Sequence, residues 1–172
     1  MSIDQHEFRQ ALSRFATGVT VVTTYDGVKP AGLTVSAFTS LSLAPPLVLI
    51  CIDRRARSHD AIALAGAFAV NVLTDRQEPV ARRFAARDGE KFPPGSYRLS
   101  ERGLPLLADV LATIECRLVN MLPGGDHSIY VGEVLEASVK PGQPLLYYRS
   151  QYGRFVAADV LLHALDRRNG VG

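Results

Sequence analysis

The sequence predicts a mainly β fold, a small closed or nearly closed β-barrel with helices on its outside. β-branched and aromatic residues, which favour strands, gather in about six or seven short runs such as VTVVTTY at 19–25. Turn residues, including Asp26-Gly27 and Pro45-Pro46, separate these runs. About three or four short stretches have helical spacing. Many short strands with few short helices are typical of a barrel with peripheral helices.

The length and the composition exclude several classes of protein. A chain of 172 residues suits one domain with a substantial core, so we expect a single domain over 1–172. The net charge of +2 and the lack of a Lys/Arg-rich run argue against a nucleic-acid partner. No apolar run approaches membrane-spanning length, and the initial MSIDQHEF lacks the features of a signal peptide. We therefore expect a cytoplasmic protein without membrane contact, in which Cys51 and Cys116 are buried free thiols.

The first third of the chain predicts one helix followed by strands. Residues 4–16 carry apolar side chains at helical spacing, and Ser2 or Asp4 can cap the start of this helix. The run at 19–25 predicts a strand, and Asp26-Gly27 predicts a hairpin to a return strand.

The stretch from Gly32 to Asp53 predicts two strands separated by the rigid turn at Pro45-Pro46. Its first half is rich in small and hydroxylated residues, and its second half is apolar. Buried hydroxyls need hydrogen-bond partners, because an unpaired buried polar group is costly. Two interpretations are open. A bound polar ligand can supply the partners, or the segment is an edge strand whose hydroxyls bind water.

Arginines gather at the start of a short predicted helix. The helix is expected to begin after Ser58, its N-cap, and to end near Gly66. Three arginines, Arg54, Arg55 and Arg57, come immediately before its start. Free amides at a helix start, a hydroxyl and guanidinium groups together form a good phosphate site. The alternative interpretation is a solvated charged loop.

The rest of the chain continues the alternation of strands and short helices. The expected elements are a strand at 67–73, a helix at 76–86 with Pro79 in its first turn, a long loop at 87–105, strands at 112–121 and 128–139, an aromatic-rich segment at 145–155 and an apolar tail at 156–165 that forms a helix or an oligomer arm.

Common catalytic motifs are missing from the sequence. It contains no GxGxxG or GxxxxGK[ST] motif, which argues against a Rossmann or P-loop site, and no GxSxG motif of a serine hydrolase. The four histidines show no metal-ligand spacing, so we expect no metal site. The simplest remaining carrier of chemistry is a bound organic cofactor.

Seven segments, in this order, resemble the short-chain flavin reductase family. These NAD(P)H:flavin oxidoreductases are the reductase components of two-component flavin-dependent monooxygenases. The segments are FRQALSRFATGVTVVTT, GLTVSAFTSLSLAPPLVLICI, RSHDAI, FAVNVL, ARRFA, GGDHSIYVGEV and LLYYRSQYGRF. They span residues 8–155 and leave 156–172 as a C-terminal tail. The resemblance implies a Greek-key-like, FMN-binding split barrel that forms a homodimer.

The resemblance also implies a set of site residues. The flavin ring is expected against the strand that matches Thr34 to Ser40, with its pyrimidine edge at backbone groups there and near Cys51 to Asp53. Its phosphate is expected near Arg57 and Ser58, and the segment 84–86 also lines it. The implied flavin-binding residues are Gly32, Thr34, Val35, Ser36, Ala37, Phe38, Thr39, Ser40, Cys51, Ile52, Asp53, Arg57, Ser58, His59, Phe84 and Ala85. The implied nicotinamide-binding residues are His127, Tyr152, Gly153, Arg154 and Phe155, and His127 is the implied catalytic residue.

Several interpretations of His127 are open. It ends a Gly-Gly turn, where it can contact the nicotinamide amide, supply a proton to the reduced flavin, or cap the turn. The function that the resemblance implies is reduction of FMN or FAD by NADH or NADPH, with diffusion of reduced flavin to a partner monooxygenase. The alternatives are a non-catalytic FMN-binding split barrel and a split-barrel oxidase similar to pyridoxamine-phosphate oxidase.

Overall fold

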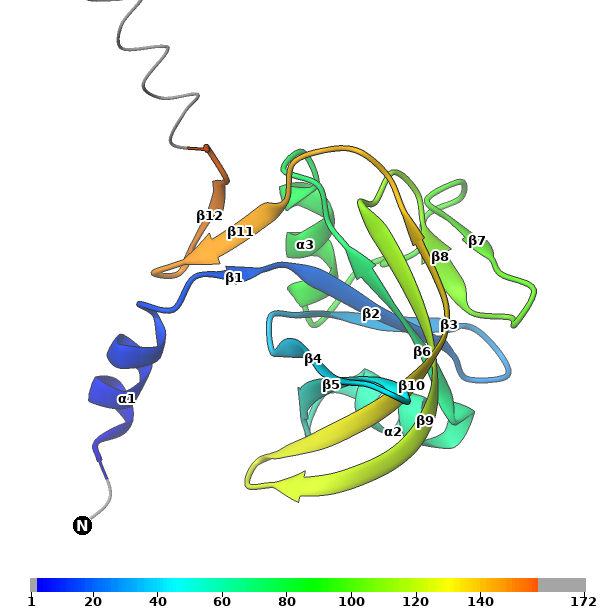
Figure 1. The fold of residues 1–172 in the computed structure, drawn as a ribbon, viewed down its shortest axis with the longest axis horizontal. Coiled ribbons are helices and arrows are strands. Elements are labelled where there is room, and N and C mark those ends of the chain that lie inside the picture. Colours follow the sequence, from blue (N-terminus) through cyan, green and yellow to red (C-terminus); the bar gives the residue numbers. More distant parts are fainter. Residues whose placement is uncertain (1–2, 158–172) are drawn as a thin grey trace, which may run out of the picture.

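Strands dominate residues 3–157, the part of the chain that the computed structural model describes (Figure 1). The helices are α1 (Gln5–Leu12), α2 (Arg57–Ala65) and α3 (Glu78–Ala85). The strands of the large sheet are β2 (Thr20–Tyr25), β3 (Pro30–Val35), β4 (Phe38–Leu43), β5 (Pro46–Asp53), β6 (Ala67–Val72), β9 (Ala112–Gly124) and β10 (His127–Val139). The shorter sheets contain β1 (Thr17–Gly18), β7 (Tyr97–Leu99), β8 (Pro105–Leu107), β11 (Leu145–Tyr148) and β12 (Gln151–Arg154).

The predicted mainly β fold is confirmed. The apolar tail expected at 156–165 lies, from residue 158 onward, outside the described residues. Among the residues that are described, no helix is long and apolar enough to cross a membrane.

The seven strands of the large sheet form a barrel-like layer. Their order is β3-β2-β6-β9-β10-β5-β4. Strands β3 and β4 lie at opposite edges of this order, yet only Ser36 and Ala37 separate them in the chain. The two edges therefore approach each other at this point, where the amide of Cys51 on β5 donates to the carbonyl of Ala37 (3.0 Å). The sequence predicts the break at Pro45-Pro46 correctly but not this earlier one.

The hydroxyl-rich half of the central stretch consequently belongs to two edge strands. The side chains of Ser36, Thr39 and Ser40 are exposed, as an edge strand in contact with water requires. Thr34 differs, because its hydroxyl donates to the carbonyl of Ala81 on α3 (2.6 Å). The edge-strand interpretation therefore accounts for this pattern without a buried ligand.

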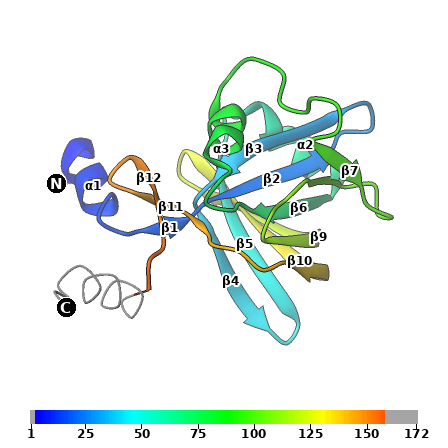
Figure 2. The ribbon, with the colours of Figure 1, turned by 90° about the horizontal axis from the view of Figure 1, so that it is seen from above.

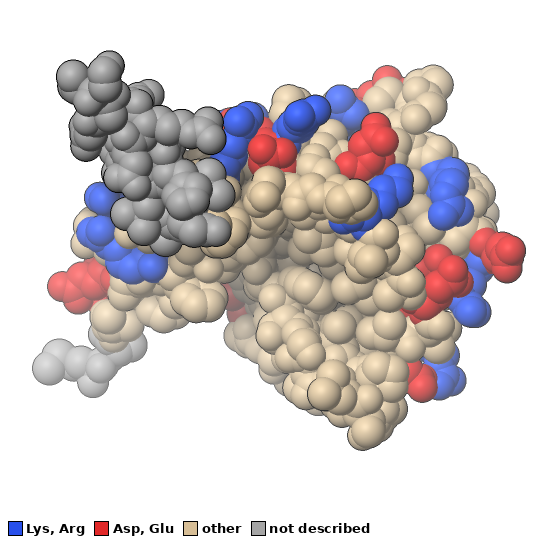
Figure 3. Space-filling view, turned by 45° about the horizontal axis from the view of Figure 1, so that its top comes forward, with Lys and Arg blue, Asp and Glu red and all other residues tan. Residues whose placement is uncertain are grey.

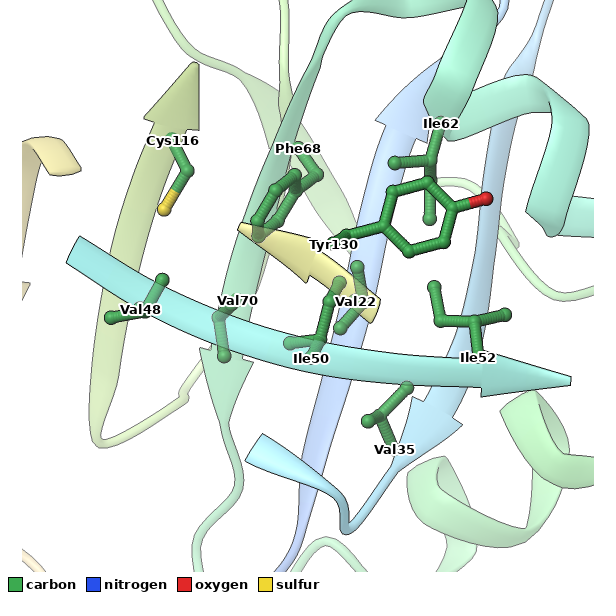
Figure 4. Close-up of a cluster of buried hydrophobic side chains, with 10 residues drawn as sticks. All are labelled: Val22, Val35, Val48, Ile50, Ile52, Ile62, Phe68, Val70, Cys116 and Tyr130. Atoms are coloured by element: carbon green, nitrogen blue, oxygen red, sulfur yellow. The ribbon is translucent and has the colours of Figure 1, made fainter. Parts of the chain in front are cut away.

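The core of the barrel lies between β5, β6 and β10 (Figure 4). Alternate residues of β5, Val48, Ile50 and Ile52, point inward and are at least 94% buried. They meet Phe68 of β6 and Tyr130 of β10, both fully buried. Each side chain of this size stabilises the fold by about 1.5–3 kcal/mol when it is fully buried.

The segment 87–105, which the sequence predicts to be a loop, contains strand β7, which pairs with β8. A buried asparagine, Asn71 on β6, ties this small sheet to the barrel. Its Oδ1 accepts from the amide of Leu107 (2.9 Å), and its Nδ2 donates to the carbonyl of Val21 (3.0 Å) and to Thr23 Oγ1 (3.0 Å). A strand of three residues is too short to show a period in the sequence.

Helix α1 and the sheet β1-β11-β12 lie to one side of the barrel (Figures 1 and 2). The carboxylate of Asp4 accepts from the amides of His6 (2.8 Å) and Glu7 (3.3 Å), which confirms the predicted cap. The helix ends at Leu12, earlier than predicted, and none of its residues is buried. Its apolar side chains are therefore not used by the core of this chain.

Gly132 on β10 provides a test of the packing. A Cβ atom added there would lie 2.5 Å from Phe68 Cζ and 2.8 Å from Cys116 Cβ. We therefore expect Gly132→Ala to lower the free energy of unfolding, measured by urea denaturation, by about 1–3 kcal/mol. Gly18→Ala is the control, since nothing lies within 4 Å of that added atom, and it should change the free energy by less than about 0.5 kcal/mol. Equal effects of the two substitutions would contradict this account.

Candidate functional site

A cavity of about 580 Å³ lies where the end of β5, the start of α2 and the end of α3 meet. Six residues predicted to bind flavin line it: Thr34, Asp53, Arg57, Ser58, Phe84 and Ala85. Ala86, from the predicted segment 84–86, also lines it. Arg55, one of the three arginines of the expected phosphate site, lines it too, and the lining residues that the sequence does not identify are Leu33, Ala56, Arg87 and Lys91.

The start of α2 forms the candidate anion-binding corner of the cavity. The helix is capped by Ala56, which offers no side-chain hydrogen bond, so its first amides have no side-chain acceptor. Ser58 lies inside the first turn, and the prediction that it is the N-cap is wrong. Arg57, beside it, forms an ion pair with Asp88 (3.1 Å). Uncapped amides beside guanidinium groups attract a phosphate.

Lys91 joins two walls of the cavity. Its ammonium donates to the carbonyls of Gly32 (3.2 Å) and Phe84 (3.1 Å). Burial lowers the pKa of Lys91, and the charge of Arg57 lowers it further. The sequence offers a weak signal for this role, a lone lysine before Phe92 in a long segment between predicted strands. Only the fold shows what it contacts.

Gly32 is explained by packing within the protein. An added Cβ would lie 2.9 Å from the carbonyl oxygen of Val22 and 3.0 Å from Phe84 Cε1. Phe84 in turn contacts the edge of Phe92, with ring centroids 5.0 Å apart. Glycine at this position therefore lets the wall of the cavity pack against β3, and it does not by itself indicate close approach of a ligand.

His127 does not itself line the cavity, but the strand register of β10 and β5 places it opposite Asp53, which does. Two nitrogens of the Arg55 side chain donate to the Asp53 carboxylate (3.1 and 2.8 Å), and these bonds hold the pKa of Asp53 well below its usual range. The His127 Nδ1 lies 2.7 Å from Asp126 Oδ1, and this hydrogen bond lowers the pKa of Asp126. The Nε2 atom of His127 has no hydrogen-bond partner among residues 3–157, which leaves it available to a ligand.

The remaining predicted flavin-binding residues do not line this cavity. Val35 and Ile52 are at least 95% buried in the barrel core, where their side chains pack against the protein. His59 is also buried, and both of its ring nitrogens have protein partners. These three side chains are thus in contact with the protein itself, and their predicted contact with flavin stays a prediction. The others, Ser36, Ala37, Phe38, Thr39, Ser40 and Cys51, lie on β4, on β5 or in the β3–β4 connection.

The predicted nicotinamide segment Tyr152–Phe155 is at a different place from His127. Arg154 lines a second cavity of about 450 Å³ beside the start of α3, and its Nε lies 3.5 Å from Asp75. The guanidinium of Arg82 lies over the Tyr152 ring, 5.0 Å from its centre. Within one chain, the structure does not bring this segment to the cavity at the start of α2.

Comparison with known proteins identifies relatives over most of the chain. A family model described as a flavin reductase like domain matches residues 12–155. The reductase component of the 4-nitrophenol 4-monooxygenase/4-nitrocatechol 2-monooxygenase of Rhodococcus opacus is 44% identical over 155 residues, which cover 90% of this chain and 83% of that protein. A flavin reductase of Pseudomonas putida is 44% identical over 158 residues, covering 91% and 93%.

The fold comparison agrees with the sequence comparison. The solved structure of the NADH:FAD oxidoreductase SgcE6 of Streptomyces globisporus, in complex with NAD and FAD fragments, superposes with a TM-score of 0.85. It is 39% identical, and the superposition covers 90% of this chain and 94% of that one. The chain therefore belongs to the family of proteins with a flavin reductase like domain.

Proposed function

We propose that this protein is a flavin reductase that uses NADH to reduce FMN or FAD. The observation that carries the proposal is the cavity of about 580 Å³, where four cationic side chains and the uncapped start of α2 lie together with Asp53, the strand partner of His127. Relatives named as flavin reductase and as NADH:FAD oxidoreductase support the choice of substrate and reductant. The alternatives, a flavin-holding module and an oxidase, lack such support.

The residues of the cavity fit a flavin. Arg57 and Ser58 at the start of α2 bind the phosphate, because cations and free amides converge there. Leu33 and Phe84 provide apolar surface for the ring. The ammonium of Lys91 holds the walls together from the side, through the carbonyls of Gly32 and Phe84.

A bound flavin supplies the redox chemistry itself, since its ring accepts a hydride from a nicotinamide. The protein has to orient the two ring systems and exclude water. His127 is the orienting group in this proposal, with Nε2 directed to the nicotinamide amide and Nδ1 held by Asp126. No protein acid is needed for hydride transfer, in agreement with the lack of a paired acid and base in the sequence.

The reduced flavin is the product that leaves the protein. We propose that it diffuses to a partner monooxygenase in the cytoplasm. A relative that is the reductase component of a monooxygenase supports the kind of partner. The single-domain organisation over 1–172 remains part of the same proposal.

A homodimer completes the proposal. Apolar side chains are exposed on α1, β4 and the outer part of β9, including Leu12 (57% exposed), Leu43 (90%) and Met121 (47%). Figure 3 shows a broad area without charged side chains in the centre and lower centre of the view. Exposed apolar side chains such as these favour contact with a second copy of the chain. Sedimentation equilibrium tests it, and a species with the mass of one chain would contradict it.

The first prediction about the site concerns turnover. Absorbance at the nicotinamide band follows NADH consumption with added FMN, with added FAD and with no flavin. We expect consumption to rise with added flavin, because the flavin is a substrate that binds and leaves. A protein that keeps its flavin through gel filtration and consumes no NADH would contradict the proposal. That result would favour a flavin-holding module or an oxidase similar to pyridoxamine-phosphate oxidase.

The second prediction concerns the phosphate corner. Arg57→Ala removes a guanidinium from the cavity, and we expect it to weaken FMN binding by about 1–3 kcal/mol, the value of one charge-assisted hydrogen bond. Fluorescence titration measures the affinity. Arg54→Ala is the matched control, because Arg54 has the same charge, lies three residues away and does not line the cavity. If both variants bind FMN equally well, Arg57 is not a phosphate ligand.

The third prediction concerns His127. We expect His127→Ala to lower kcat/KM for NADH about fivefold, the loss of one hydrogen bond of about 1 kcal/mol. FMN affinity should stay within about twofold of the wild type, because His127 acts on the nicotinamide in this proposal. Steady-state kinetics and flavin titration on the same preparations provide both values. If His127→Ala changes kcat/KM for NADH and FMN affinity only slightly and equally, His127 has a structural role in the turn.

A further inference from the structure

His59 is a buried histidine that the proposed function has not used. It lies in the first turn of α2 and is 9% exposed. Its Nδ1 lies 2.7 Å from Oδ1 of Asp60, and its Nε2 lies 2.9 Å from Oγ of Ser128 on β10. An ionised carboxylate can only accept, so Nδ1–H donates to Asp60. In the neutral ring, Nε2 then accepts the hydroxyl proton of Ser128.

The order Asp60–His59–Ser128 is the hydrogen-bond order of a hydrolase triad. A nucleophilic role does not fit, because Ser128 is only 6% exposed and does not line the cavity. Its hydroxyl therefore cannot reach a substrate. The hydrogen bond between His59 and Ser128 can instead hold α2 and β10 at a fixed distance from each other.

The two elements are the start of α2 and the start of β10. The start of α2 has no side-chain cap, so contacts from β10 fix its position. Ser128 bonds to the His59 ring, and the hydroxyl of Tyr130 donates to the carbonyl of His59 (2.9 Å). The two rings also meet edge to face, with centroids 5.5 Å apart. Burial raises the pKa of Tyr130 to about 12, so its hydroxyl stays a donor at neutral pH.

Each partner in this contact is next to a residue of the proposed site. Ser58, which precedes His59, lines the cavity at its anion-binding corner. His127, which precedes Ser128, is the strand partner of Asp53, a residue of the cavity wall. The bond between His59 and Ser128 thus joins the residue next to the proposed phosphate site to the residue next to the proposed nicotinamide site.

We propose that His59 is a positioning residue that sets the distance between the flavin-phosphate site and His127. This inference rests on the proposed function. Removal of the His59–Ser128 bond loosens the start of α2 relative to the start of β10, although the Tyr130 bond to the His59 carbonyl remains. Flavin then binds less tightly, and the nicotinamide is held less well over it, although no group that touches either ligand has changed.

Two conservative substitutions separate the two ring nitrogens. In His59→Gln the side-chain amide reaches the position of Nε2 and keeps the bond to Ser128. In His59→Asn the amide reaches only the position of Nδ1 and keeps the bond to Asp60. We expect the Gln variant to stay within about twofold of the wild type in FMN affinity and in kcat/KM for NADH. We expect the Asn variant to lose about tenfold or more in kcat/KM, as a misplaced site does.

Ser128→Ala provides the reciprocal test. It removes the same bond from the β10 side, so we expect it to resemble His59→Asn. The double variant should lose little more than either single one, because the substitutions remove one shared interaction. Two independent, additive losses would overturn the proposal.

Hydrogen–deuterium exchange provides a readout that does not depend on activity. The Asn variant should exchange faster than the Gln variant in both segments, 56–60 and 126–130, since the two are held together by this bond. If exchange and FMN affinity are the same in the Gln and Asn variants, His59 is not a positioning residue. A wild type that binds flavin but consumes no NADH would instead contradict the proposed function, and the exchange comparison would still decide the role of His59.

Discussion

The pairing of β5 with β10 is the constraint on which the candidate site depends. The two strands pair over seven positions, from His127 opposite Asp53 to Glu133 opposite Leu47. Alternate residues of β5 fill the barrel core, so a slip by one residue would turn that whole apolar set outward. The hydrophobic core thereby fixes which residue of β10 stands opposite Asp53 of the cavity wall. The packing of the barrel core therefore determines which residues lie at the candidate site.

Features of the fold that depend on local signals could be predicted from the sequence. The cap at Asp4, the hairpin after Tyr25 and Pro79 at the start of α3 each follow from a few adjacent residues. The crossing at Ser36-Ala37 could not be predicted in this way. It takes the chain from one edge of a seven-stranded sheet to the other, and only pairings between distant strands determine it.

The residues of the candidate site show the same difference between local signals, which can be predicted, and contacts between distant segments, which cannot. Arg57, Ser58 and Phe84 belong to recognisable segments and line the cavity as expected. Lys91 could not be predicted, because its role is set by two carbonyls on separate elements. The family resemblance implies that His59 binds the flavin, whereas the structure buries its ring. Its partner Ser128 lies 69 positions away, and that contact turns the ring into the interior.

The ion pair between Arg57 and Asp88 has a consequence for the response of the site to ionic strength. Both side chains are more than 80% exposed, so dissolved salt screens their attraction. Salt then frees the guanidinium from its internal competitor while it also weakens the attraction of that guanidinium for a phosphate. The two effects oppose each other. Arg57 exchanges one anionic partner, Asp88, for another, the flavin phosphate. Flavin binding should therefore depend less on salt concentration than it would with an arginine that has no internal partner.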